Sequence, residues 1–201
     1  MTMVIFERAR LPATPWKNGG GVTREIACVP PQSGMHDFDW RLSIAHIACD
    51  GDFSVFEGVD RVITLLEGAG VQLHSPSGGL EHRLDTPGSP FAFPGDVPVH
   101  ARLLAGDCHD LNVMTRRGVC RAEVSVLKPG DVLAPCTAGL LLALQGSWQL
   151  DAEGLGPESA ASLNVAADSG VWWHQEMLTW RAQSPHTDAA LLTVRILPAA
   201  L

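Results

Sequence analysis

The sequence predicts an all-β fold, built as two small barrels or sandwiches in tandem. Three observations predict it: many short apolar or alternating segments, twenty glycines and fourteen prolines scattered between them, and a weak internal repeat. With 201 residues, 46% of them hydrophobic and 18% charged, the chain can form one large core or two smaller ones. No segment shows the apolar stripe of an amphipathic helix.

The predicted strands fall into two series. The first consists of residues 3–6, 22–28, 40–47, 62–66, 71–74, 91–93, 99–104 and 111–114. After a break at Arg116, Arg117 and Gly118, the second consists of residues 122–127, 140–144, 148–150, 162–165, 171–173, 178–181 and 190–197. The break predicts a first lobe of residues 1–117 and a second lobe of residues 118–201.

The internal repeat supports this division. VITLLEGAGVQL around Gly68 resembles LLLALQGSWQLD around Gly146, and a closing strand follows each glycine after roughly 45 residues. The first copy carries polar residues such as Asp60, Arg61 and Asn112 where the second has mainly Leu, Ala and Val. Candidate chemistry is therefore expected in the first lobe.

Composition excludes several classes of function. The net charge of −8 and the pI near 5.4 give no basic surface for a nucleic acid. Neither a signal peptide nor a membrane helix is evident, which predicts a cytoplasmic protein. Five cysteines without CxxC spacing and eight histidines without HxH, HxxxH or HExxH spacing predict reduced thiols, no metal and no other cofactor.

The densest local signal is WKNGGGVTREI, residues 16–26. Three consecutive glycines allow positive φ angles and a close backbone approach, and their N–H groups can form an anion-binding concavity beside Lys17. The alternative is a flexible loop with a solvated lysine.

Arginines form the second cluster: Arg24, Arg41 and Arg61. In FDWRLSIAHI, strand alternation places Arg41 and Ser43 on the face opposite Trp40 and Leu42. If that face lines a barrel, Arg41 and Ser43 present donors to a carboxylate. If it is an outer sheet surface, they are solvated.

These motifs resemble the HutD/Ves family. WKNGGGVTREI, FDWRLSIAHI, DGDFSVFEGVDRVITLLEGAGVQL and FAFPGDVPVHARLLAGDCHDLNVM follow the family order over residues 2–117. The resemblance implies an RmlC-like double cupin, two tandem jelly-roll barrels. Metal cupins carry an HxH and Glu set in the first motif, where this chain has only Glu57 and Glu67. With His100 as the single histidine of the second motif, no metal site is expected.

The resemblance also implies a role in moderating histidine utilisation through a bound metabolite. The leading hypothesis is therefore a non-enzymatic bicupin that binds a small anionic metabolite of the urocanate, formiminoglutamate or formate class. The proposed ligand-binding residues are Trp16, Lys17, Asn18, Gly19, Gly20, Gly21, Thr23, Arg41, Ser43, Phe56, Arg61, Asn112 and Met114.

Two alternatives stay open. One is a metal-free RmlC-like isomerase or hydrolase acting on a small carboxylate, with His100 or Glu57 as general base and Lys17 or Arg61 stabilising a developing anion. The other is a protein-interaction module without a natural ligand. A homodimer formed through edge strands is compatible with each reading.

Overall fold

The computed structural model describes residues 2–34, 37–154 and 161–199. Within these ranges the chain forms seventeen β-strands and one 3₁₀ helix, η1 (Arg8–Arg10), which confirms the predicted all-β class. Within these ranges, no helix is long and apolar enough to cross a lipid bilayer. Two compact units are present. The N-terminal unit comprises residues 11–121 and those from 198 onward, and the C-terminal unit comprises residues 1–10 and 122–197.

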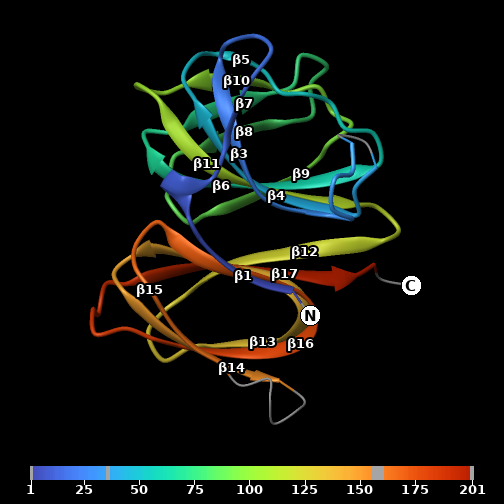
Figure 1. Cartoon of the computed structure of the whole chain (residues 1–201). Coiled ribbons are helices and arrows are strands. Elements are labelled where there is room, and N and C mark those ends of the chain that lie inside the picture. The colour runs from blue at the N-terminus through green and yellow to red at the C-terminus, as the bar shows by residue number, and fades with distance from the viewer. Residues whose placement is uncertain (1, 35–36, 155–160, 200–201) are drawn as a thin grey trace. The chain divides into compact units, whose positions relative to one another are not determined.

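A six-stranded antiparallel sheet forms one wall of the N-terminal unit (Figure 1). Its order is β2-β3-β4-β11-β6-β9, so the two long strands β4 and β11 lie at its centre. The bounds are β2 (Ala13–Pro15), β3 (Gly21–Val29), β4 (Trp40–Ile47), β6 (Val59–Gly68), β9 (Pro90–Pro94) and β11 (Cys108–Arg116).

A four-stranded sheet forms the facing wall, in the order β5-β10-β7-β8. Its strands are β5 (Gly51–Asp52), β7 (Val71–His74), β8 (Glu81–Leu84) and β10 (His100–Leu103). One buried cluster contains Leu73 and Ala101 from this sheet together with Ile47 and Leu65 from the six-stranded sheet. The two sheets therefore enclose a common hydrophobic interior, and alternate residues of each strand point into it.

The C-terminal unit is a single seven-stranded sheet in the order β12-β17-β13-β16-β14-β15, with β1 paired to β16. The bounds are β1 (Thr2–Glu7), β12 (Cys120–Leu127), β13 (Val132–Gln145), β14 (Trp148–Gly154), β15 (Ala161–Val165), β16 (Ser169–Gln183) and β17 (Ala190–Pro198). Trp173 and Trp180 are fully buried in its core, with ring centroids 5.4 Å apart.

The division into units departs from the expected lobes at the N-terminus. The boundary between the two units lies between residues 121 and 122, close to the expected boundary after residue 117. Residues 1–10, however, belong to the C-terminal unit. The reason is the pairing of β1 along β16, from Thr2 opposite His174 to Glu7 opposite Ser169. In Figure 1 the blue strand β1 accordingly lies among the strands of the C-terminal unit. The expected outer limits, residues 1 and 201, lie outside the described residues.

Candidate functional site

The inner face of the six-stranded sheet carries a row of polar side chains next to its apolar core. On β4, Ala45 and Ile47 belong to the interior cluster, so Arg41 and Ser43 share their face by strand alternation. On β6, Ile63 and Leu65 place Arg61 on the same face. The structure therefore places Arg41 and Ser43 on the face that lines the interior, and not on an outer sheet surface.

Strand β11 aligns further polar residues between these two strands. Asn112 pairs with Ser43 on one side and Ile63 on the other, and Met114 pairs with Arg41 and Arg61. Four of the proposed residues, Arg41, Ser43, Arg61 and Asn112, therefore meet on one surface, with Met114 beside them.

The same alternation places Asp110 on this surface, two residues before Asn112. Asp110 lies opposite Ala45 and Leu65 and is only 3% exposed. Sequence reasoning did not select it, although the alternation of DLNVM was a sufficient signal. A buried carboxyl is thus a further member of the candidate site.

Arg61 is the most unusual group of the site. Its side chain is almost fully buried, and its guanidinium carbon lies 5.1, 5.7 and 5.0 Å from the ring centroids of Phe53, Phe56 and Phe93. Its hydrogen bonds are long: Nε donates to Asn112 Oδ1 at 3.5 Å and one terminal nitrogen donates to the Ser54 carbonyl at 3.4 Å. No carboxylate of the described residues forms an ion pair with it, so most of its five donors lack a close acceptor.

Burial alters the ionisation of both charged groups. It lowers the pKa of Arg61 to about 10, with the nearby Asp110 acting in the opposite direction. It raises the pKa of Asp110 to about 7, against the opposing effect of Arg61. Asp110 Oδ1 has no hydrogen-bond partner within the described residues. Near neutral pH, Arg61 is charged and Asp110 is close to its titration midpoint.

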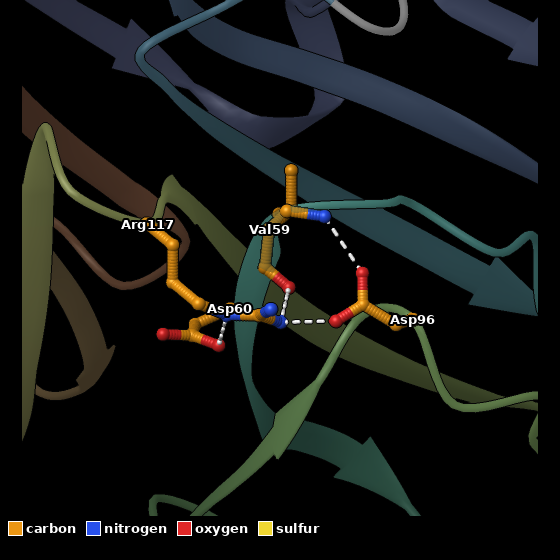
Figure 2. Close-up of polar contacts among 5 residues, drawn as sticks. Val59, Asp60, Asp96 and Arg117 are labelled. Carbon is orange, nitrogen blue, oxygen red and sulfur yellow. Dashed lines mark hydrogen bonds and ion pairs between the residues drawn. The ribbon is translucent and has the colours of Figure 1, made fainter.

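The residue before Arg61, Asp60, lies on the opposite face of β6 and belongs to an ion-pair network. Asp60, exposed on the opposite face of β6, accepts from Arg117 Nε at 2.7 Å, and Arg117 also pairs with Asp96 and donates to the Val59 carbonyl at 3.1 Å. Figure 2 shows Arg117 held between the two aspartates at the start of the strand. Asp96 additionally accepts from the Gly58 N–H at 2.6 Å. The side chain of Asp60 therefore points outward to this network, whereas that of Arg61 points inward.

Arg41 differs from Arg61 because it has a carboxylate partner. Its Nε lies 2.7 Å from Glu25 Oε2, and the two side chains are 17% and 48% exposed. Glu25 pairs with Ser43 across β3 and β4. Arg41 therefore contributes positive charge near the site, but its charge is already balanced.

The WKNGGG segment forms the tight connection from β2 to β3. The Gly19 N–H donates to the Trp16 carbonyl at 3.0 Å and the Gly20 N–H to Asn18 Oδ1 at 3.0 Å, so these donors are used within the loop. Gly19 has φ +73°, and a Cβ added to Gly21 would lie 2.1 Å from the His46 carbonyl oxygen. The glycines are needed for the turn and for this close approach.

This loop and Arg61 lie at opposite ends of the sheet. Gly21 pairs with Ile47, whereas Arg61 is in register with Arg41 through Met114. The two levels are six positions apart along β4, roughly 20 Å. The structure therefore does not bring the loop group together with Arg61. That group consists of Trp16, Lys17, Asn18, Gly19, Gly20 and Gly21. Thr23 lies within β3 opposite Ala45, which pairs on its other side with Asp110.

The loop side chains have separate environments. Trp16 packs against the interior cluster, and its Nε1 donates to Thr23 Oγ1 at 2.8 Å. Lys17 and Asn18 are exposed. Phe56, by contrast, joins Met114 in a buried cluster beside Arg61.

The two candidate bases also lie away from Arg61. His100 is on the outer face of the four-stranded sheet, opposite His74, and its Nδ1 lies 2.7 Å from Asp52 Oδ1. Glu57 is exposed. On that outer face, a surface cleft of about 590 Å³ is lined by residues that include Gln72, His74 and Arg102. Among the described side chains, no three His, Cys, Asp or Glu residues are grouped to hold a metal ion.

Comparison with known proteins decides the family. The HutD family model matches residues 8–192. The chain belongs to the HutD family. Protein Ves of Citrobacter koseri is 39% identical over 197 residues, which cover 98% of this chain and 96% of that protein.

Solved structures of similar proteins share the fold. A conserved protein of unknown function from Pseudomonas aeruginosa PAO1 has a TM-score of 0.83 and 30% identity, covering 98% of this chain and 99% of its own. HutD from Pseudomonas fluorescens SBW25 has a TM-score of 0.80 and 25% identity, covering 99% and 100%. Oxalate decarboxylase from Bacillus subtilis, 10% identical with a TM-score of 0.62, covers 97% of this chain and 77% of its own. These matches confirm the RmlC-like double cupin.

Proposed function

We propose that this protein binds a small carboxylate metabolite at Arg61 and, through the bound metabolite, moderates histidine utilisation in the cytoplasm. The observation that carries the proposal is the Arg61 guanidinium, which is buried among three phenyl rings and has no carboxylate partner within the described residues. A buried cation is strongly destabilised unless it is paired. A bound anion would supply the partner that Arg61 lacks among the described side chains. A carboxylate matches the planar fork of a guanidinium with two parallel hydrogen bonds.

The structure suggests how an anion reaches Arg61. The segment 53–56 lies on the guanidinium, and its residues Ser54 and Val55 are exposed. The Ser54 carbonyl accepts from Arg61 at 3.4 Å, which is beyond the usual range for an N–H···O bond. A carboxylate oxygen forms shorter, charge-assisted bonds and would replace this carbonyl. Phe53, Phe56 and Asn112 would then surround the bound group.

The family comparisons support this class of ligand. The P. fluorescens HutD structure was determined in a formate condition. Formate is the smallest carboxylate, and the metabolites of histidine breakdown named above are larger carboxylates. Arg61 and Asn112 would bind the carboxylate group that formate and these metabolites have in common.

Binding is tested with EDTA-treated protein and the ligands histidine, urocanate, formiminoglutamate, formylglutamate and formate. A ligand at 100 times its Kd should raise the free energy of unfolding by about 2.7 kcal/mol, which thermal denaturation detects. Arg61→Met keeps an apolar stem in the interior and should weaken binding at least about thirtyfold, since truncating one partner of a buried charge pair costs about 2–5 kcal/mol.

Arg102→Ala is the matched control, because Arg102 is an exposed arginine of the same unit that lines the outer cleft. It should leave the affinity unchanged. Loss of binding in Arg102→Ala, with Arg61→Met unaffected, would place the ligand in the cleft and contradict the proposal. Product analysis of each bound metabolite completes the test: a ligand recovered unchanged supports a binding protein, whereas a consumed ligand would make the chain an enzyme.

The regulatory part of the proposal has its own test. A strain that lacks the protein should grow on histidine with altered induction of the histidine-degradation genes. The Arg61→Met variant should fail to restore the normal response, and the Arg102→Ala variant should restore it. Full restoration by Arg61→Met would separate the physiological role from carboxylate binding.

A further inference from the structure

The buried carboxyl of Asp110 has no role in the function proposed above. It lies on the inner face of β11 between Cys108 and Asn112, opposite the apolar residues Ala45 and Leu65. It is 3% exposed, and its Oδ1 has no hydrogen-bond partner within the described residues. A carboxylate in such a place is stabilised chiefly by the field of a nearby cation, and Arg61 is the cation that acts on it.

Asp110 faces few other groups that could change their charge. The titratable and charged residues on the inner faces of the two sheets are Arg61 on β6, Arg41 on β4, Glu25 and Cys28 on β3, Cys108 and Arg116 on β11 and His82 on β8. Arg116 lies at the far end of β11, opposite Val59, and its Nε donates to the Phe38 carbonyl at 2.8 Å. Burial lowers the pKa of His82 and raises the pKa of Cys108 to about 12 and of Cys28 above its usual value. Arg41 and Glu25 form an ion pair. Among the groups with a shifted pKa, Asp110, at about 7, is therefore the one that titrates near neutral pH.

A ligand at Arg61 changes this balance. Apart from the ion pair of Arg41 with Glu25, the empty site holds one cation, Arg61, and one carboxyl that shares its field. A bound carboxylate neutralises Arg61 and adds a negative charge to the same buried surface, where like charges repel strongly because the effective dielectric constant is low. Two carboxylates and one guanidinium cannot all remain ionised there without a large penalty. Protonation of Asp110 restores a neutral set of one cation and one anion.

We propose that Asp110 makes ligand binding proton-linked: the protein takes up a proton from solvent on Asp110 when a carboxylate binds to Arg61. This inference rests on the proposed function and adds its regulation. By linkage, a proton taken up on binding makes affinity rise as pH falls, by up to tenfold per pH unit above the midpoint of Asp110. At a constant metabolite concentration, a small fall in pH near neutrality would thus increase the fraction of the protein that has ligand bound.

The test is calorimetric titration of the full chain with formate and with formylglutamate, whose carboxylates stay ionised between pH 6 and 8. Two buffers with different ionisation enthalpies give the number of protons taken up. Wild type should take up a substantial fraction of one proton at pH 7.5, and its Kd should rise by up to about tenfold between pH 6 and 8. Asp110→Asn, which imitates the protonated acid, should bind with a Kd independent of pH and without proton uptake. At pH 8 it should bind more tightly than wild type.

Glu153→Gln is the control, because Glu153 is an exposed carboxylate in the C-terminal unit. It should behave as wild type. A wild-type Kd that does not change with pH, or binding without proton uptake, overturns the inference and leaves carboxylate binding intact. Absence of binding at every pH overturns the proposed function as well. Because the proton count is made on wild type, the inference stays testable even if Asp110→Asn fails to fold.

Discussion

Asp60 and Arg61 are consecutive residues of β6 with opposite environments: Asp60 is exposed and paired with Arg117, whereas Arg61 is buried among Phe53, Phe56 and Phe93. Strand alternation alone produces this contrast. The network around Arg117 joins the start of β6 to the loop of Asp96 and to the turn after β11 (Figure 2). It holds in place the strand that carries the candidate ligand-binding arginine.

Asp96→Ala should lower the urea midpoint of unfolding more than Asp60→Ala. Asp96 bonds both to Arg117 and to the Gly58 N–H, whereas Asp60 bonds only to Arg117 among these groups. The lost backbone acceptor adds to the lost ion pair, and an exposed ion pair by itself contributes little. Equal midpoints for the two variants would show that the Gly58 contact does not stabilise the fold.

Gly21→Ala should lower the free energy of unfolding by at least about 2 kcal/mol, because the new Cβ would overlap the His46 carbonyl and force the backbone of β3 away from β4. Gly51→Ala is the control. Its Cβ would meet only Asn18 Nδ2 at 3.6 Å, so the change should stay within about 0.5 kcal/mol. Urea denaturation followed by tryptophan fluorescence measures both. A tolerated Gly21→Ala would contradict the close strand approach.

The free energy of unfolding of wild type should fall as pH rises from about 4 to about 7. In this range the folded protein keeps a proton on Asp110, whose pKa is raised to about 7, while the unfolded chain has released it. The folded state therefore binds more protons, and stability is lost as pH rises, by on the order of 4 kcal/mol at most. Asp110→Asn should flatten this slope and Glu153→Gln should not. If Asp110→Asn showed the same dependence of stability on pH as wild type, that dependence would come from other groups.

Phe6→Ala should destabilise the protein by roughly 3 kcal/mol, because Phe6 is a buried aromatic side chain and packs close to Gly170. Its neighbour Ile5 is 56% exposed, so Ile5→Ala should cost less than about 0.5 kcal/mol. Thermal denaturation of the two variants tests whether β1 is part of the C-terminal unit. Similar small effects would indicate that β1 contributes little to that unit.

The sequence predicted the strands with apolar alternation and missed those without it. Strand β8, with sequence EHRL, presents mostly polar side chains, and β5 has two residues, so neither shows an apolar pattern. The segments 171–173 and 178–181 were predicted as separate strands. They form one strand, β16, which passes through Gln175 at a φ of +67°. Local patterns carry no information on such continuity.

The candidate site was predictable in its parts but not in its assembly. Alternation in WRLSIAHI and DLNVM correctly gives the faces of Arg41, Ser43 and Asn112. Which residues then lie at the same level depends on strand register, and register placed Lys17 and the glycine turn at the end of the sheet away from Arg61. That Arg61 has no carboxylate partner among the described residues depends on contacts between distant strands, which a single sequence does not show.

The pairing of β1 with β16 also affects how the chain folds during synthesis. Thr2 is synthesised well before its partner His174, which follows it by 172 residues. At about 5–20 residues per second, β1 waits roughly 10–30 s without a partner. During that time the N-terminal unit can complete its own sheets, while Val4, Ile5 and Phe6 stay open to solvent and to other chains. The C-terminal unit therefore depends on a strand that is made long before the rest of that unit, and this unpaired strand is exposed to aggregation in the meantime.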